Sequence, residues 1–376
     1  MKRTVLIVCA VIFLVPVLLS AAQPLLKGFY WMSGTGRMLS APDSRFDSFL
    51  QNFDRNLKDN QYLSGVYLNA RWQDINPEEG VYKLERLDKL ISLIKKHKKY
   101  YHLTIYPGCS SPAFIYKKGC AQFKAVDPNK YRSTYGKELT IPLPWDPIYK
   151  KYYYQMLAKL AEKYGNDPSL IAITIVPYSF KSSELHLPAS RRDMQNWEKY
   201  PDYKQKLVDE AKSAVDKFAA LFPKQQLAFE LGMLVGAQRS ESEIASIIEY
   251  GYTKYPARFT IQSDQLNGKF DNSQMFTYKL IMKYKKRGHN GFQSLSAWRH
   301  ANTTAKRQGS MELAVLNYVK TGAEFWQLWY GDGDSTEVCA KLDKILKQAE
   351  AMGYEVYLDK LKKENKYKAF VPSFKR

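Results

Sequence analysis

Three acidic residues lie at or near the ends of short apolar stretches, where their side chains suit proton-transfer chemistry. Glu184 follows the aromatic residues Tyr178 and Phe180. Glu230 interrupts one apolar stretch, and Asp264 ends another. Removing a carboxyl group from water raises its pKa toward neutrality, so that it can donate a proton near pH 7. Several such groups at one site are typical of general acid–base catalysis.

Glu230 and Asp264 each have a second interpretation. Alternation along Ala228–Gly232 places the Glu230 carboxyl group on the face opposite Phe229 and Leu231. An acid in an apolar strand costs several kcal/mol unless it is paired or functional. The pairing alternative is an ion pair with Arg71, and the alternative for Asp264 is a cap on the following turn. We rank Glu230 slightly above Asp264 as a reactive group.

The elements that must position these residues are eight short β-rich stretches separated by amphipathic helical patterns. Strands that alternate with helices form parallel βαβ units, and eight units close a single-domain α/β fold, the (β/α)8 TIM barrel. Reactive groups in such a barrel lie at the C-terminal ends of its strands. The predicted strands are Leu26–Gly34, Tyr62–Asn69, Tyr101–Pro107, Ile171–Tyr178, Leu227–Gly232, Phe259–Asp264, Gly291–Ser296 and Glu324–Tyr330.

Apolar residues at helical spacing predict the intervening helices. Two long connecting segments, the excursions, interrupt the regular alternation of strands and helices. The excursions, Ser110–Asp146 and His186–Pro201, follow the third and fourth strands, where long loops shape substrate access. The helical stripes run over Phe46–Leu57, Leu84–Ile94, Tyr153–Tyr164, Leu207–Phe218, Ile244–Ile248 and Val338–Leu346.

The N-terminus has the pattern of a secretory signal peptide. Basic Lys2 and Arg3 precede an apolar run from Val5 to Leu19, and small residues follow to Ala22. The run is shorter than the roughly 20 apolar residues that span a bilayer, so we expect cleavage after residue 22 and no stable membrane span. The predicted organisation is a signal peptide at 1–22, a barrel domain at 23–353 and a basic extension at 354–376. The expected location is secreted or periplasmic.

The charge of the chain favours anionic partners. Its 57 Lys and Arg residues against 37 Asp and Glu residues give a formal net charge of +20 at pH 7. An anionic polysaccharide is therefore one candidate ligand, although a solvated basic exterior explains most of these lysines. Helix-turn-helix, zinc-finger and aromatic ribonucleoprotein motifs are missing from the sequence, so we predict no nucleic-acid partner.

Cysteine spacing predicts a disulfide and no metal site. Cys109 and Cys120 bracket a loop after the third strand and are a plausible pair in an oxidising compartment. The cysteines have no Cys or His neighbour at zinc-ligand spacing. The sequence also has no phosphate-binding loop, nucleophile elbow or H-E-x-x-H helix, so we predict no cofactor.

Three motifs carry a family resemblance. The stretch Asn69–Tyr82 matches W-x-x-(I/L)-x-P-x-x-G-x-Y after the second strand, and Pro107–Phe114 matches the G-x-x-(S/T)-P-x-(W/F) loop after the third. The segments Pro142–Pro147, Lys163–Pro168 and Ser182–Glu184 are similar to a fourth βα unit. The chain thus resembles barrel glycoside hydrolases, notably β-galactosidase-like family 42 and cellulase-like members of their largest clan. The resemblance spans roughly 26–332 and is best over 65–187.

This resemblance implies a role for Glu184 and leaves the second carboxylate open. The clan places its general acid/base after strand four, where Glu184 is the matching residue. Its nucleophile is a glutamate at the end of strand seven, but Gly291–Trp298 contains no acid. Glycoside cleavage needs a second carboxylate about 5 Å away for retention or about 6.5–9.5 Å away for inversion. Glu230 and Asp264 are the replacements.

Aromatic and amide side chains near the predicted strand ends suggest sugar binding. Sugar rings stack their C–H faces on aromatic rings, and planar polar groups hold their hydroxyls. Trp326 and Trp329 cannot both face inward from a regular strand, and we retain Trp329. The predicted binding residues are Tyr30, Asn69, Arg71, Trp72, Tyr106, Trp145, Tyr178, Gln293, Trp298, Gln327 and Trp329.

The sequence therefore predicts an exported hydrolase of O-glycosidic bonds in a polysaccharide or oligosaccharide. The competing hypothesis is a carbohydrate-binding protein that has lost the strand-seven nucleophile. A basic envelope protein with the barrel as a scaffold is the third. The position of Glu184 relative to Glu230 and Asp264 distinguishes the first two.

Overall fold

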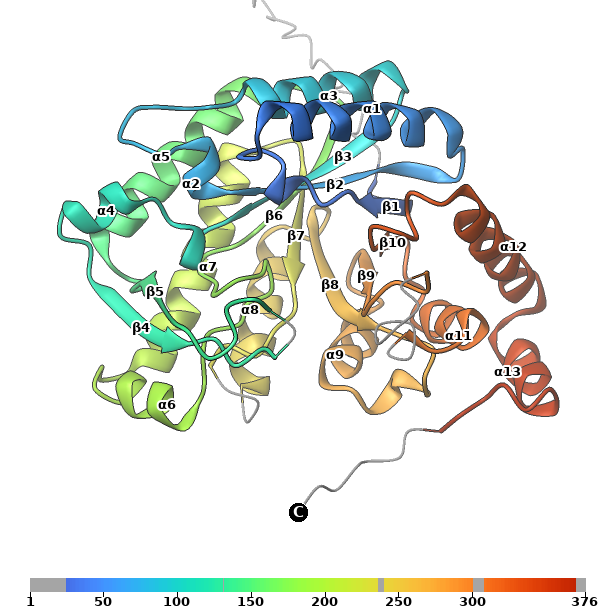
Figure 1. Cartoon of the computed structure of the whole chain (residues 1–376). Coiled ribbons are helices and arrows are strands. Elements are labelled where there is room, and N and C mark those ends of the chain that lie inside the picture. Colours follow the sequence, from blue (N-terminus) through green and yellow to red (C-terminus); the bar gives the residue numbers. More distant parts are fainter. Residues whose placement is uncertain (1–24, 131, 236–239, 300–307, 370–376) are drawn as a thin grey trace, which may run out of the picture.

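Eight parallel strands close into a barrel in the computed structural model, which describes residues 25–130, 132–235, 240–299 and 308–369 (Figure 1). The strand order around the barrel is β1-β10-β9-β8-β7-β6-β3-β2. The predicted single-domain (β/α)8 barrel and its eight strand positions are therefore confirmed. The barrel strands are β1 (Gly28–Met32), β2 (Leu63–Arg71), β3 (Tyr100–Tyr106), β6 (Leu170–Thr174), β7 (Gln226–Glu230), β8 (Phe259–Leu266), β9 (Asn290–Ser294) and β10 (Phe325–Leu328).

Helices surround the barrel, and each of the six predicted helical stripes falls on one of them (Figure 1). Helices α9 and α11 complete the ring. Helix α13 lies within the predicted basic extension and packs on α11 with Tyr357 and Leu361 buried. The helices are α1 (Asp43–Asp59), α2 (Trp72–Ile75), α3 (Glu85–Lys96), α4 (Ala113–Lys117), α5 (Pro147–Tyr164), α6 (Arg191–Trp197), α7 (Tyr203–Leu221), α8 (Glu241–Lys254), α9 (Phe276–Tyr284), α11 (Met311–Thr321), α12 (Thr336–Met352) and α13 (Tyr354–Lys363).

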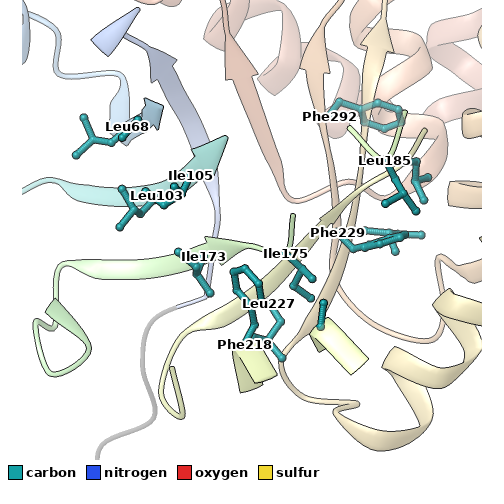
Figure 2. Close-up of a cluster of buried hydrophobic side chains, with 14 of the residues drawn as sticks. Leu68, Leu103, Ile105, Ile173, Ile175, Leu185, Phe218, Leu227, Phe229 and Phe292 are labelled. Atoms are coloured by element: carbon teal, nitrogen blue, oxygen red, sulfur yellow. The ribbon is translucent and has the colours of Figure 1, made fainter. Parts of the chain in front are cut away.

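The outer faces of the strands form the apolar core between barrel and helices. Leu103 and Ile105 alternate with polar neighbours along β3 and are buried, as are Leu227 and Phe229 along β7. Figure 2 shows part of this layer, with Phe218 of α7 beside Leu227. Because side chains alternate across a strand, the intervening residues point into the barrel.

An aromatic plug fills the barrel near the starts of its strands. Tyr30 and Phe325 pack there with Leu26 and the first residues of β6. A Cβ atom at Gly65 would lie 2.6 Å from the Tyr30 ring, so only glycine leaves room for it. The plug closes the N-terminal end of the barrel and leaves the polar groups toward the other end.

The excursion after β3 contains a structure that the sequence pattern did not predict. Strands β4 (Gln122–Val126) and β5 (Glu138–Pro142) form an antiparallel hairpin beside α6 (Figure 1). The Phe123 ring stacks on Trp197 of α6 with the ring centroids 3.8 Å apart. This contact joins the excursion after β3 to the excursion after β6.

The predicted Cys109–Cys120 disulfide is not formed in the structure, where both residues are free cysteines. Cys109 lies in a 3₁₀ turn after β3, whereas Cys120 follows α4, which occupies the loop between them. Burial raises the pKa of each thiol to about 12. The loop is therefore held by packing rather than by a covalent link.

Helices in the described ranges are all too short or too polar to cross a bilayer. The predicted signal peptide at 1–22 lies outside the described residues, so export and cleavage remain predictions.

Candidate active site

The three acidic residues singled out in the sequence meet inside the C-terminal end of the barrel. Glu230 ends β7, and Asp264 lies toward the end of the neighbouring strand β8. Glu230 is 1% exposed and Asp264 is 9% exposed, whereas Glu184 is half-buried. Burial raises the pKa of Glu184 and of Asp264, the charge on Glu230 raises both further, and the charge on Glu184 adds to the rise at Asp264. The three groups therefore titrate as one cluster.

The segment that carries Glu184 runs alongside the chain that follows β7. The Leu187 amide donates to the Leu234 carbonyl at 2.9 Å, and both Leu185 and Leu187 are buried. A Cβ atom at position 232 would lie 2.3 Å from the Leu185 carbonyl oxygen, so Gly232 permits the close approach. Backbone packing thus places Glu184 next to Glu230, although it is ten residues beyond the end of β6.

Glu230 and Asp264 are buried carboxyl groups on the neighbouring strands β7 and β8. The Tyr67 hydroxyl donates to Glu230 Oε1 at 2.9 Å, and the Thr174 hydroxyl lies 3.3 Å from the same atom. Glu230 Oε2 has no hydrogen-bond partner among the described residues, and the neighbouring Asp264 carboxyl group is one of the groups that affect the pKa of Glu230. Two carboxyl groups can bond only if one is protonated. Burial raises the pKa of both groups, and the charges on Glu230 and Glu184 raise that of Asp264 further, whereas hydrogen bonds from Ser183, Tyr67 and Thr174 oppose the rise at Glu230.

A chain of hydrogen bonds through the barrel interior supports the charge on Glu230. Gln327 Nε2 lies 3.1 Å from His102 Nδ1, and His102 Nε2 lies 2.8 Å from Thr174 Oγ1. Because the amide can only donate, His102 accepts at Nδ1 and donates at Nε2. Burial lowers the pKa of His102 to about 3, so the ring is neutral. The Thr174 hydroxyl hydrogen is then free to point at Glu230.

A second branch of the same network reaches Asp264. Gln262 Nε2 donates to Asp264 Oδ1 at 2.8 Å and to Gln327 Oε1 at 3.1 Å. Gln327 Nε2 returns a bond to Gln262 Oε1 at 2.9 Å. Gln327 therefore links the branches that end on the two carboxyl groups, and both are held in fixed orientations.

Glu184 differs from this pair because it retains a titratable proton near neutral pH. Desolvation, followed by the charge on Glu230, raises the pKa of Glu184 to about 7, and Arg132 opposes the rise. The site thus contains a carboxyl group that is about half protonated at pH 7 beside the hydrogen-bonded Glu230. This division of roles between acidic groups suits general acid–base chemistry.

The raised pKa predicts how Glu184→Gln changes stability with pH. Folding raises this pKa from 4.5 to about 7, so the unfolded chain loses the proton first as pH increases. The free energy of unfolding therefore falls between these values. We expect Glu184→Gln to stabilise the protein by roughly 3 kcal/mol at pH 8 and not at pH 4. Urea denaturation at both pH values measures the difference, and equal shifts at the two values would refute it.

Some predicted binding residues lie in or near the carboxyl cluster. Asn69 Nδ2 donates to the Tyr106 hydroxyl at 3.1 Å, and both residues are half-buried on the inner face of the barrel. Gln327 is fully buried in the network, and its neighbour on β9, Gln293, is 8% exposed. Asn69 and Tyr106 are thus placed to meet a ligand, whereas Gln327 acts through the carboxyl groups.

Other predicted binding residues lie elsewhere. Tyr30 belongs to the plug at the opposite end of the barrel. Trp72 is buried against α5, and the Tyr178 hydroxyl donates to a carbonyl of α7. Arg71 binds Asp74 through two nitrogen atoms at 2.6 and 3.1 Å. Arg71 is therefore not the partner of Glu230, and the ion-pair alternative from the sequence is wrong.

Three tryptophans lie in segments that follow barrel strands or the β4–β5 hairpin, and all are half-buried. Trp145 packs against Trp197 and Tyr200. The indole N–H of Trp298 donates to the Gly309 carbonyl, and that of Trp329 donates to the Ser294 carbonyl. Their exposed edges remain candidates for sugar contact.

The sequence pattern did not single out the polar groups that orient the carboxyl pair. Alternation could have identified several of them, because Tyr67 shares a strand face with Asn69, and Gln262 shares one with Asp264. Ser183 lies 3.0 Å from the Tyr67 hydroxyl and had no such signal. The missed residues are Tyr67, His102, Thr174, Ser183 and Gln262.

Comparison with known proteins supports the resemblance seen in the motifs. The glycosyl hydrolase 42 family model, described as β-galactosidase, matches residues 63–220. This segment contains the three motifs and Glu184, so the resemblance to barrel glycoside hydrolases is confirmed. No curated protein matches the chain in sequence.

Solved structures share the fold at low sequence identity. The cold-adapted β-galactosidase of Rahnella sp. R3 has a TM-score of 0.52 and 12% identity over 90% of this chain and 57% of its own. The β-galactosidase of Marinomonas ef1 has a TM-score of 0.51 and 12% identity over 90% and 61%. The β-amylase catalytic domain of Paenibacillus polymyxa has a TM-score of 0.54 and 11% identity over 87% and 100%. The chain thus spans about three-fifths of the β-galactosidases.

Proposed function

We propose that the protein is an exported glycoside hydrolase that cleaves O-glycosidic bonds in a polysaccharide or oligosaccharide. The observation that carries this proposal is the meeting of Glu184, Glu230 and Asp264, with raised pKa values, at the end of the barrel where such folds hold their reactive groups. The family-model match over 63–220 supports the same class of reaction.

In the proposed reaction, Glu184 donates its proton to the glycosidic oxygen as the bond to the anomeric carbon breaks. Positive charge then develops on the sugar ring, and the ionised Glu230 stabilises it. Asp264 keeps its proton beside Glu230, while Tyr67 and Thr174 hold Glu230 Oε1. Water then attacks the anomeric carbon and gives a proton to Glu184, which restores the acid.

Glu230 suits the role of second carboxylate better than Asp264 does. Its Oε1 atom accepts from a phenol, and a chain of neutral donors points at it. Asp264 has a pKa raised well above its ordinary value by burial and by the charges on Glu230 and Glu184. At neutral pH the pair therefore presents one negative charge, centred on Glu230.

The pH dependence of hydrolysis follows from these assignments. The rate should decline about tenfold per pH unit above pH 7, because Glu184 loses the proton that it must donate. The rate should also decline toward acid pH, where Glu230 gains a proton. This decline should be centred above pH 4.5, because burial raises the pKa of Glu230 from that value. Steady-state rates from pH 4 to 10 check both limbs. A rate that stays level from pH 7 to 10 would contradict the role of Glu184.

One observation favours the second candidate function, carbohydrate binding without cleavage. The seventh barrel strand, β9, ends in Gln293 and Ser294, where the resemblance implies a nucleophilic glutamate. If Glu230 cannot reach the anomeric carbon, the site retains an acid but has no partner for it. The protein would then bind glycans through its aromatic side chains.

An activity screen separates these two functions. The chain from residue 23, without the predicted signal peptide, is incubated with plant, microbial and host glycans, and new reducing ends are quantified. Cleavage by the unmodified protein and none by Glu184→Gln supports the hydrolase. Glycan affinity without cleavage by either protein supports the binding function and contradicts the proposed reaction.

A further inference from the structure

A pair of cationic side chains lies beside Glu184 and has no part in the proposed bond cleavage. Arg132 lies in the connection between β4 and β5, and Lys181 lies in the segment after β6. Arg132 Nη1 is 3.5 Å from an oxygen of Asp127, and Lys181 Nζ is 3.7 Å from the other oxygen. Two positive charges thus share one carboxylate, which leaves one positive charge in excess.

The Asp127 carboxylate is already satisfied by closer partners. It is fully buried and accepts from the Thr134 hydroxyl at 2.6 Å and from the Asn129 amide at 3.1 Å. Charge-assisted N–H···O bonds are normally about 2.7–2.9 Å long, so both cation contacts are loose. Asp127 therefore shapes the connection between β4 and β5 and holds the cations in place without consuming their donors.

Both cations keep donors that a ligand can use. The Arg132 side chain is 32% exposed, and within the described part of the chain its bond to Asp127 occupies one of its five N–H groups. The Lys181 side chain is 26% exposed and donates to Thr134 Oγ1 at 2.5 Å, which leaves two N–H groups. A carboxylate or sulfate group can accept from such donors in pairs.

Lys181 lies three residues before Glu184 in the segment after β6, and Arg132 contacts the same Asp127 carboxylate as Lys181, so both cations are placed near the acid. Burial raises the pKa of Glu184, and the Arg132 charge opposes this rise. Burial lowers the pKa of His186, and the Arg132 charge lowers it further. Glu184 is largely neutral below pH 7, so it does not cancel the excess charge. The site is thus positive around Arg132 and Lys181 and negative around Glu230.

We infer that Arg132 and Lys181 form a subsite for an anionic group, so that the substrate is a glycan that carries carboxylate or sulfate. This inference rests on the proposed function for the position of the sugar relative to Glu184. The anionic group binds Arg132 and Lys181, and the scissile bond lies between Glu184 and Glu230. The division of charge fits a substrate that is anionic at one sugar position and develops positive charge at the anomeric carbon.

The test compares acidic glycans with neutral ones of similar size. Affinities of Glu184→Gln are measured by calorimetry for oligogalacturonate, hyaluronan and sulfated oligosaccharides, and for neutral galacto- and cello-oligosaccharides. We expect at least one acidic probe to bind tenfold or more tightly than any neutral probe. Adding Arg132→Gln should abolish that preference, Lys181→Gln should reduce it, and Arg132→Lys should restore part of it.

Arg192→Gln is the matched control, because Arg192 also binds the hairpin, at Glu138 with a 2.8 Å contact, but lies on α6. It should leave the preference unchanged. Equal affinity for acidic and neutral probes, or a preference that survives Arg132→Gln, would overturn the subsite. If the protein cleaves neutral glycans and shows no preference for acidic ones, the anionic subsite is wrong but the proposed hydrolase function stands. If the protein binds an acidic glycan through Arg132 but never cleaves it, the proposed hydrolase function is wrong and the anionic subsite stands.

Discussion

Glu184→Gln is expected to lower the turnover number for a natural glycan by about 10²–10⁴-fold, the usual contribution of general acid catalysis. The amide is the same size as the acid but has no proton to give at neutral pH. Binding should remain within a few fold, because the half-buried side chain keeps its shape. Steady-state kinetics on a glycan found by screening measure the two effects separately.

The leaving group supplies a sharper version of this test. An aryl glycoside with a strongly acidic phenol needs no protonation, so Glu184→Gln should cleave it far better than a natural linkage. The control is Glu198→Gln, which changes an exposed glutamate at the end of α6 and should leave both substrates unaffected. An equal loss for both leaving groups would show that Glu184 does not act as the acid.

Glu230→Gln is expected to reduce turnover by about 10³-fold or more, because the negative charge that stabilises the transition state disappears. The variant should fold, since the glutamine oxygen can still accept from Tyr67 and the amide can donate to Asp264. Kinetics are measured together with thermal stability so that unfolding is not mistaken for lost chemistry.

Asp264→Asn is the matched partner of that variant. An asparagine can donate its amide hydrogen to Glu230 Oε2 while its oxygen accepts from Gln262, so it reproduces the bonds of a protonated aspartate. We therefore expect Asp264→Asn to retain activity within about tenfold. If Asp264→Asn is inactive and Glu230→Gln is active, the charge and the proton are assigned to the wrong members of the pair.

The barrel could be predicted from the sequence because its signals are local. Each strand is a short apolar run, and each predicted helix carries a stripe of apolar residues, so the order of elements determined the fold. The β4–β5 hairpin was missed because its strands are short and only partly apolar, as Gln122–Val126 illustrates. Its position depends on the contact between Phe123 and Trp197, which are distant in sequence.

The carboxyl cluster was anticipated more fully than its surroundings were. Alternation placed Glu230 inside the barrel, and the motif order pointed to Glu184. Trp72 and Tyr178 looked like binding residues because they follow strands, but their rings face α5 and α7. A single position near a strand end does not reveal which way a large ring turns, since tertiary packing decides it. The role of Gln327 required the three-dimensional network.

The proposed reaction requires that Glu184 carry a proton near neutral pH beside a negatively charged Glu230. A carbon-13 NMR titration of the glutamate carboxyl groups measures this directly, with Glu184→Gln used to assign the resonance. We predict one glutamate that titrates near pH 7, disappears in Glu184→Gln and shifts to lower pH in Glu230→Gln, where the neighbouring charge is gone. A spectrum in which the Glu184 resonance titrates at or below pH 4.5 would contradict the account.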